Sequence, residues 1–373
     1  MLLLAIETSC DETAAAVLEV RECVGAWVRG EGEVRECVGA WVRGKREGQE
    51  ALPEAVVLSD VVASQVADHA PYGGVVPELA SRKHLTAILP VIRRALEEAG
   101  GSLDDIDALA VTAGPGLVGS LLIGIQAAKA IAHARKKPLV GVHHLAAHLL
   151  SSHLRRPGAT LAPPAFPYLS LVVSGGHTAL YRVDGPERIR RLAATRDDAA
   201  GEAFDKVGKL LGLPYPGGPA IDEAARGVDP GELHFPRGLD RKDTLDFSFS
   251  GLKTAVADVV RAHGGRPAGD EVRRIAAAFQ RSVVSSLVRK SLAACGQTGV
   301  RRLTMGGGVA ANGGLRAAMA EACVAAGVEL FLPVFSDCTD NAAMVGLAAV
   351  PRLVRGEDDG GALAARSVWE LGD

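Results

Sequence analysis

The chain has 373 residues, enough for two domains of ordinary size and too many for a small module held together by disulfides. Apolar residues make up 48% of it but aromatic residues only 4%, so its core must be built mostly from Ala, Val, Leu and Ile. With 44 glycines and 23% charged residues, the composition is typical of a soluble α/β protein and excludes a disordered or fibrous chain.

The net charge of −3 excludes a protein that is basic over its whole surface. A local basic patch for nucleic acid stays compatible with it, because affinity depends on where Arg and Lys cluster. No run of about 18 apolar residues is free of charge, so we expect no contact with a membrane. The first residues lack the basic start of a signal peptide, and the six cysteines form no Cys-x-x-Cys pair. We therefore expect a cytoplasmic protein with reduced thiols.

The chain opens with a predicted hairpin. Residues 2–6 are apolar, residues 7–13 form a polar turn, and residues 14–20 are apolar again. In chain order, the next predicted elements are a strand at 54–64, a helix at 87–99, a strand at 106–112, a helix that ends at about 134 and a strand at 139–142. This alternation of strand, glycine turn and helix favours parallel βαβ units.

A near-duplicate interrupts the first half. Residues 20–33 and 34–47 are identical at 12 of 14 positions. Two copies are too few for a solenoid, which needs about three or more repeats to bury a core. The simplest interpretation is a tandem duplication within a surface hairpin. The alternative is an added docking surface that uses Trp27 and Trp41. We expect activity to survive deletion of 34–47, and loss of activity in a folded deletion variant would contradict this.

The second half begins like the first. After a proline-rich stretch, 156–167, a strand at 168–173 leads through a small polar turn into a strand at 179–183. The same order of strand, polar turn and strand opened the chain. Two similar openings indicate two related halves that face each other across a cleft.

The sequence His144-Leu145-Ala146-Ala147-His148 predicts a metal site. Residues four apart lie on one face of a helix, so both imidazoles can reach one ion. His143 and His153 flank the pair, and a chance cluster at a helix start is the competing interpretation. No Glu follows the first His, which counts against the zinc-peptidase pattern with a Glu as general base.

A third metal ligand should come from elsewhere in the chain. Residues 335–341 offer the carboxylates of Asp337 and Asp340 and the thiol of Cys338, and spacing does not choose among them. Two His and one carboxylate would leave coordination positions open for a substrate.

Three glycine-rich turns favour a nucleotide-type ligand. They lie at 174–177, 215–219 and 306–312, and the third follows a predicted strand at 302–305 and is expected to open a helix. Glycines let backbone N–H groups approach a phosphate or a ribose closely. Asp205 and Asp222 bracket the second turn, where each could bind a ribose or an amino group.

Eight motifs, in order, resemble the bacterial TsaD family of tRNA N6-adenosine threonylcarbamoyltransferases. They lie at 7–14, 72–82, 144–148, 174–178, 201–206, 247–253, 306–312 and 338–341. The resemblance implies the fold of actin, the sugar kinases and the chaperone ATPases, with two similar ribonuclease H-like α/β domains facing a central cleft. The domains would be 1–140 plus 346–373, with the insert at about 20–50, and 141–345.

The resemblance also implies the reaction and its participants. A threonylcarbamoyl group would move from threonylcarbamoyl-AMP to N6 of adenosine 37, in tRNAs that read codons beginning with A. One divalent metal per subunit is implied, with Fe²⁺ favoured over Zn²⁺. The family works with a paralogous partner, TsaB, and an ATPase partner, TsaE.

By resemblance, the metal ligands would be His144, His148 and Asp340. The polar turn of the first hairpin would contribute Ser9, Asp11 and Glu12 to the catalytic wall. The substrate would be bound by Val173, Ser174, Gly175, Gly176, His177, Asp205, Gly218, Asp222 and Asn312.

Two other functions compete with a transferase. One is a metallopeptidase acting on glycoproteins, which lacks a Glu base beside the His pair. The other is a non-enzymatic, actin-like ATP-binding module or a related sugar kinase, which would leave the His pair and Asp340 unexplained.

Overall fold

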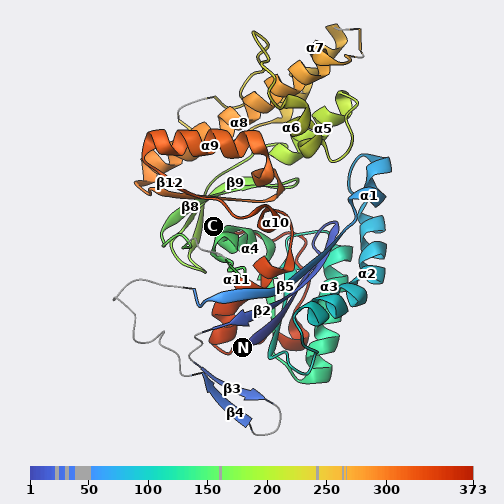
Figure 1. Ribbon diagram of the computed structural model, residues 1–373, viewed down its shortest axis with the longest axis vertical. Helices are drawn as coiled ribbons and strands as arrows, with labels where there is room; N and C mark the ends of the chain where they lie inside the picture. Colours follow the sequence, from blue (N-terminus) through green and yellow to red (C-terminus); the bar gives the residue numbers. More distant parts are fainter. Residues whose placement is uncertain are drawn as a thin grey trace.

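The computed structural model consists of two lobes, each built on a five-stranded mixed sheet (Figure 1). It describes residues 1–21, 25–29, 33–37, 52–158, 162–240, 243–262, 264–265 and 267–372. Among the described helices, none combines the length and the apolar character needed to cross a membrane.

The sheet of the first lobe has the strand order β5-β2-β1-β6-β7. Its strands are β1 (Leu2–Glu7), β2 (Glu12–Val20), β5 (Ala55–Ser64), β6 (Ala108–Gly114) and β7 (Leu139–His143). β1 pairs antiparallel with β2 and parallel with β6, so this central strand joins a hairpin to a parallel pair. β5 pairs antiparallel with β2, and β7 parallel with β6.

Helices cover both faces of the first sheet, because side chains of a strand alternate between faces. Leu4 and Ile6 pack in the cluster that includes α2 (Pro77–Glu98) and α3 (Val118–Arg135). Leu3 and Ala5 pack in the cluster of α11 (Ala342–Val354), which returns from the end of the chain. These buried positions are aliphatic, as the low aromatic content predicts.

The sheet of the second lobe has the order β10-β9-β8-β11-β12. Its strands are β8 (Tyr168–Val173), β9 (Thr178–Val183), β10 (Ile189–Ala194), β11 (Arg302–Gly306) and β12 (Glu329–Phe331). The helices of this lobe are α5 (Ala200–Leu210), α6 (Gly217–Ala225), α7 (Ser250–Ala262), α8 (Asp270–Thr298) and α9 (Gly313–Ala326). One large core cluster joins the sheet to these helices.

The two sheets share one topology. In each, the first strand along the chain lies in the middle, two antiparallel strands follow on one side, and two parallel strands lie on the other. This confirms the expected α/β fold with two related halves. The short helix α4 (His144–Leu150) sits between the sheets and contacts β7, β8, β11 and α11.

The remaining described elements are short. They are β3 (Gly25–Arg29), β4 (Glu33–Cys37), α1 (Val66–His69), η2 (Ala70–Tyr72), η3 (Ser151–His153), η4 (Gly308–Ala311), α10 (Phe335–Cys338) and η5 (Gly360–Ala362). β3 and β4 pair only with each other, apart from both large sheets (Figure 1). The rest of the duplicated segment lies outside the described residues, so its predicted role stays a prediction.

One predicted helix boundary was wrong. The helix expected at 87–99 begins at Pro77, a residue whose fixed φ suits a first helical position. Its first ten residues bury only Ala80 and His84, so the apolar pattern there is too sparse to reveal a helix. The glycine turn at 306–312 opens a helix as predicted: it contains the 3₁₀ turn η4, and its last residue, Asn312, caps α9.

Candidate functional site

Helix α4 brings the two predicted His ligands together. The parallel strand β7 ends at His143, whose side chain accepts a hydrogen bond from the Leu145 N–H at 3.2 Å and so caps the helix. His144 and His148 follow at i and i+4, and both are buried. Their ring centroids are 4.7 Å apart, with the rings nearly perpendicular. The four-residue spacing therefore places both imidazoles on one side of α4, directed at a common point.

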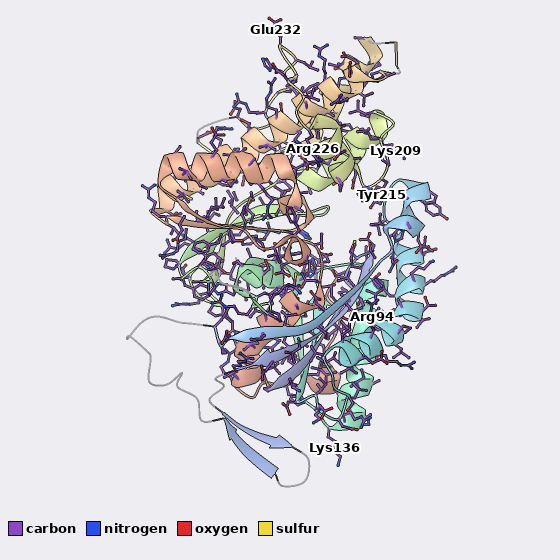
Figure 2. All side chains as sticks on the ribbon, viewed as in Figure 1. Arg94, Lys136, Lys209, Tyr215, Arg226 and Glu232 are labelled. Carbon is purple, nitrogen blue, oxygen red and sulfur yellow. The ribbon has the colours of Figure 1, made fainter. Side chains whose placement is uncertain are left out.

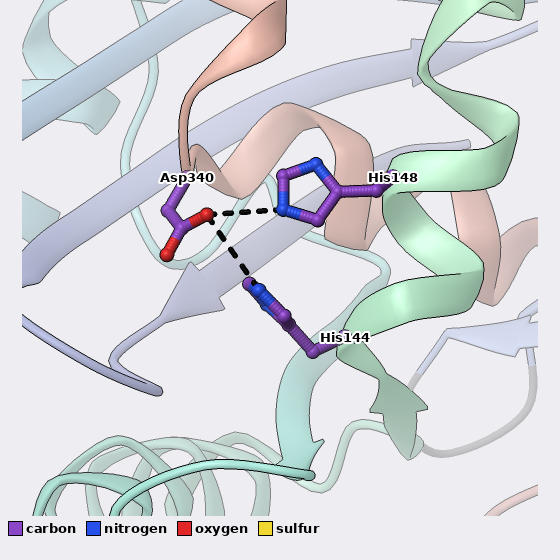
Figure 3. A group of neighbouring side chains, drawn as sticks. All are labelled: His144, His148 and Asp340. Carbon is purple, nitrogen blue, oxygen red and sulfur yellow. Dashed lines mark hydrogen bonds and ion pairs between the residues drawn. The ribbon is translucent and has the colours of Figure 1, made fainter. Parts of the chain in front are cut away.

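Asp340 completes the group from the segment between α10 and α11. Its Oδ1 lies 3.0 Å from His148 Nε2 and 3.6 Å from His144 Nε2 (Figure 3). One nitrogen of each His and one oxygen of Asp340 all fall within 4.8 Å of one another. Two nitrogens and one oxygen, converging in a largely buried place, could hold a divalent metal ion.

The other potential metal ligands, in residues 335–341 and beside the His pair, contact other groups. Arg156 forms an ion pair with Asp337 and, at 2.6 Å, with Asp60 of β5, so Asp337 ties α10 to the first lobe. The Cys338 thiol is buried and directed at the Val334 carbonyl at 3.5 Å. The ring of His143 contacts Trp369. The ring of His153 stacks on Phe166.

Sequence reasoning missed a carboxylate behind His144. Glu7, at the end of β1, is fully buried, and its Oε2 lies 3.1 Å from His144 Nδ1. The Thr112 hydroxyl donates to the same oxygen at 2.6 Å, and the Ser9 N–H donates to Oε1. A carboxylate at Nδ1 fixes the ring and leaves Nε2 for a metal. The signal in the sequence is a Glu that ends an apolar strand.

The charges of His144, Asp340 and Glu7 stabilise one another. Burial opposes the charged form of His144, but Asp340 and Glu7 outweigh it and raise the pKa of His144 to about 9. Burial also opposes the charged form of Asp340, yet the imidazoles of His144 and His148 lower its pKa below the usual range. The two carboxylates therefore favour a positive charge at His144.

The polar turn of the first hairpin lines the same centre. The Ser9 hydroxyl lies 3.3 Å from His144 Nδ1. Burial, together with the nearby carboxylates of Asp340 and Asp11, raises the pKa of Glu12 to about 10. The Glu12 carboxyl also accepts a hydrogen bond from Ser64 at 3.2 Å. Ser9 therefore contacts the metal group directly, Glu12 is near enough to feel the charge of Asp340, and Asp11 lies between them in the chain.

The corresponding turn of the second lobe is also close to this centre. His177 is close enough to His144, His148 and Asp340 for their charges to act on it, and burial with the two imidazoles lowers its pKa to about 4. The neutral His177 ring can then accept or donate a hydrogen bond. The two hairpin turns of the two lobes therefore meet at the His144 and His148 pair.

The three glycine turns come together through close backbone contacts. Gly307 has φ of +88°, and a Cβ there would lie 2.4 Å from the Val173 carbonyl oxygen. A Cβ on Gly201, at the start of α5, would lie 2.6 Å from the Ser174 carbonyl oxygen. The Asp205 carboxylate accepts the Gly217 N–H at 2.7 Å, which adds the remaining turn.

Several glycines of these turns face open space. A Cβ added to Gly175, Gly176, Gly218 or Gly308 would have no protein atom within 4 Å. Packing within the chain therefore does not require glycine at these four positions. The space and the accessible backbone N–H groups fit a ligand that approaches the backbone closely.

Two expected substrate residues are already engaged within the protein. Asp222 accepts the Gly313 N–H at 2.9 Å and a hydrogen bond from Gln280 at 3.0 Å. The Asn312 side chain caps α9 by accepting the Leu315 N–H at 2.8 Å, and donates to Gln280 at 2.8 Å. Gln280 joins the two and was not foreseen, because no pattern distinguishes a buried Gln within the 29 residues of α8.

Comparison with solved structures supports the fold. The chain is similar to component A of the (R)-2-hydroxyglutaryl-CoA dehydratase of Acidaminococcus fermentans, with a TM-score of 0.50 and 15% identity, covering 94% of this chain and 98% of that one. It is also similar to full-length HypF in its phosphate- and nucleotide-bound form, with a TM-score of 0.52 and 13% identity. That match covers 73% of this chain and 42% of HypF, and at these identities the likeness concerns the fold alone.

Comparison of sequences is more specific. The model of the TsaD family, described as tRNA N6-adenosine threonylcarbamoyltransferase, matches residues 56–347. A protein of that name from Sorangium cellulosum is 53% identical over 367 residues, covering 96% of this chain and 94% of its own. One from Geobacter sulfurreducens is 50% identical over 371 residues, covering 100% and 97%. The chain therefore belongs to the TsaD family of tRNA N6-adenosine threonylcarbamoyltransferases.

Proposed function

We propose that this chain transfers the threonylcarbamoyl group of threonylcarbamoyl-AMP to N6 of adenosine 37, in tRNAs that read codons beginning with A. The observation that carries the proposal is the meeting of the His144, His148 and Asp340 group with the open glycine turns between the two lobes. An acyl adenylate needs both parts, a cation beside its reacting end and a backbone cradle for its nucleotide.

The donor set fits one divalent metal, held by His144, His148 and Asp340. Two imidazoles and a carboxylate suit Fe²⁺ and Zn²⁺, and we favour Fe²⁺. Glu7, at His144 Nδ1, would leave Nε2 free to bind the ion, and the carboxylates of Asp340 and Glu7 would offset its positive charge. When bound, such an ion supplies Lewis-acid polarisation of a carbonyl or a phosphate.

The glycine turns are the proposed cradle of the adenylate. Val173, Ser174, Gly175, Gly176 and His177 form the turn that faces the metal group, with open space before its two glycines. Gly218 adds a further unobstructed backbone position, and Asp205 braces its turn. Asp222 and Asn312 would support the cradle indirectly, because both accept hydrogen bonds from backbone N–H groups at the start of α9 and so fix the backbone there.

Positioning is the main contribution of these residues to the rate. The exocyclic amine of adenine is a weak nucleophile, so transfer depends on holding it against the activated carbonyl. The Ser9, Asp11 and Glu12 turn forms the wall from which the amine approaches, and the Asp11 carboxylate can take up the proton that the amine loses. Backbone N–H groups of the glycine turns stabilise charge that develops on the adenylate.

The proposal includes partners and location. We expect the paralogue TsaB and the ATPase TsaE to assist the reaction, and the reaction to take place in the cytoplasm where tRNA and reduced thiols occur. The metallopeptidase alternative has no observation that favours it over the transferase.

Reconstitution tests the proposed function. The full chain, with TsaB and TsaE, is incubated with threonylcarbamoyl-AMP and unmodified tRNA, and the tRNA is digested to nucleosides for mass analysis. We expect a new adenosine derivative heavier by one threonylcarbamoyl group, absent when the chain carries His148→Ala. A wild-type sample that consumes no threonylcarbamoyl-AMP and leaves the adenosine unmodified would contradict the proposal.

A further inference from the structure

A cavity of about 320 Å³ lies between the lobes and shares no lining residue with the metal group. One wall is η2 and the Gly73 that follows it, in the first lobe. The opposite wall is the end of α5 with the segment that leads into α6, including Lys209 and Tyr215. The Ser174–His177 and Gly306–Asn312 turns of the proposed adenylate cradle do not line it, whereas Asp205 and the third turn, at Tyr215 and Gly217, lie at its border.

The first wall carries an aromatic ring, that of Tyr72, which is not packed in the core. Tyr72 is 62% exposed, although a large ring gains most from burial. Gly73 behind it has φ of +71°, which turns the chain sharply at this point. The ring of Tyr72 therefore stands at the mouth of the cavity on a fixed turn.

The second wall adds a cation and another ring. A Cβ on Gly73 would lie 3.3 Å from Lys209 Nζ, so this ammonium reaches across to the backbone of the opposite lobe. Lys209 is exposed and forms no ion pair with the part of the chain that the structure describes. Figure 2 shows Lys209 and Tyr215 on the side of the second lobe that faces α1.

The charge of the cavity changes with depth. Tyr215 is half-buried, and burial together with the carboxylates of Asp11 and Asp205 raises the pKa of its hydroxyl. Asp11 lies two residues after Ser9, whose hydroxyl is 3.3 Å from His144 Nδ1, so the Tyr215 side of the cavity is the side toward the metal group. A ligand here would meet carboxylates inside and an ammonium outside.

We propose that this cavity binds the target adenine of the RNA substrate as a base turned out of its loop, with Tyr72 and Tyr215 as stacking surfaces and Lys209 as the contact for its phosphate. The inference rests on the proposed function and adds the residues that receive the RNA. Single-stranded bases commonly stack on aromatic side chains, and Lys positions the backbone phosphate. The inner carboxylate of Asp205 accepts a hydrogen bond from an exocyclic amine and repels phosphate, which orients the base inward.

The test uses an anticodon stem-loop RNA with the fluorescent base 2-aminopurine in place of the target adenine. The full chain, with its partner proteins present, is titrated into this RNA. Stacking should quench the fluorescence as the complex forms. An otherwise identical RNA without a base at that position should bind at least fivefold more weakly than the adenine form in a competition assay.

Variants separate stacking from a general structural effect. Tyr72→Leu should weaken binding at least fivefold and abolish most of the quench, whereas Tyr72→Phe keeps the ring and should bind like the wild type. Lys209→Gln should weaken binding and make it less dependent on salt by about one phosphate contact. The matched control is Lys136→Gln, an exposed Lys at the far end of the first lobe (Figure 2).

The outcomes distinguish this inference from the proposed function. Equal binding of the wild type and Tyr72→Leu, equal binding of the abasic and adenine RNAs, or no binding by the wild type would each overturn the cavity assignment. Base-dependent binding without formation of a modified nucleoside would instead retain the cavity and reject the transferase activity.

Discussion

The two lobes have the same strand order but different chemistry in the turn of their first hairpin. In the first lobe, carboxyl groups lie in and beside the turn between β1 and β2, including the buried Glu7 at the end of β1 that contacts His144. In the second lobe, the turn between β8 and β9 carries Gly175 and Gly176, with open space before them. The repeated fold thus brings the two turns close together. The first lobe contributes carboxyl groups for the proposed metal site, and the second contributes glycines for the proposed adenylate site. Changes in one turn should therefore leave the ligand of the other turn bound.

Removing a charge from the metal group should have the largest effect. Asp340→Asn keeps the shape but takes away the only carboxylate among the three proposed ligands, so we expect metal affinity to fall by roughly a hundredfold or more. Calorimetric titration with Zn²⁺ or Fe²⁺ measures this. Binding of a non-hydrolysable adenylate analogue should change far less. A comparable loss of metal affinity and of analogue affinity would contradict the assignment of the two ligands to two different parts of the site.

Changing the carboxylate behind the ligand should have a smaller effect. Glu7→Gln keeps one oxygen for a hydrogen bond but loses the charge at His144 Nδ1, so we expect metal affinity to fall about 10- to 100-fold. The same titration measures it. Thr112→Val removes only the hydroxyl that supports Glu7 and serves as the milder comparison. Unchanged metal affinity in Glu7→Gln would show that Glu7 does not orient His144.

A change in the glycine turns of the second lobe should weaken binding of the adenylate analogue and leave metal affinity unchanged. In Gly307→Ala, the new Cβ would lie 2.4 Å from the Val173 carbonyl at a φ of +88°, so the cradle must shift. We expect a stability loss on the order of 2 kcal/mol and weaker binding of the adenylate analogue, with metal affinity retained. Gly296→Ala is the control, because this glycine lies in α8, outside the three turns, and its Cβ would meet no atom within 4 Å. Equal behaviour of the two variants would contradict the close approach.

Alkaline pH should destabilise the metal-free chain. The folded-state pKa of His144, about 9, lies above its usual 6.5, so its contribution is full below pH 6.5 and is lost as pH rises through 9. Glu12, with a folded-state pKa of about 10, acts in the same direction. The melting temperature without metal should therefore fall between pH 7 and 9. A flat or rising curve there would contradict the assigned contacts.

Sequence alone predicted the parts of the site that depend on local spacing. The pair of His144 and His148 follows from helical periodicity, and the repeated opening of the two halves indicated the shared topology. It did not distinguish Asp340 from Asp337, because that choice depends on the ion pair of Asp337 with Arg156. Glu7 was missed since its contact with His144 spans 137 residues and exists only once β1 and β7 share a sheet. Long-range contacts of this kind follow from topology, which local patterns do not specify.

Metal add-back tests the central claim most directly. The full chain is stripped with a chelator, returned to its partner proteins, threonylcarbamoyl-AMP and tRNA, and titrated with Fe²⁺ or Zn²⁺ while the modified nucleoside is quantified. The account predicts almost no product in the stripped sample and a rise that levels off at one metal per chain. Full activity in the stripped sample, or a rise that is the same in Asp340→Asn, would contradict it.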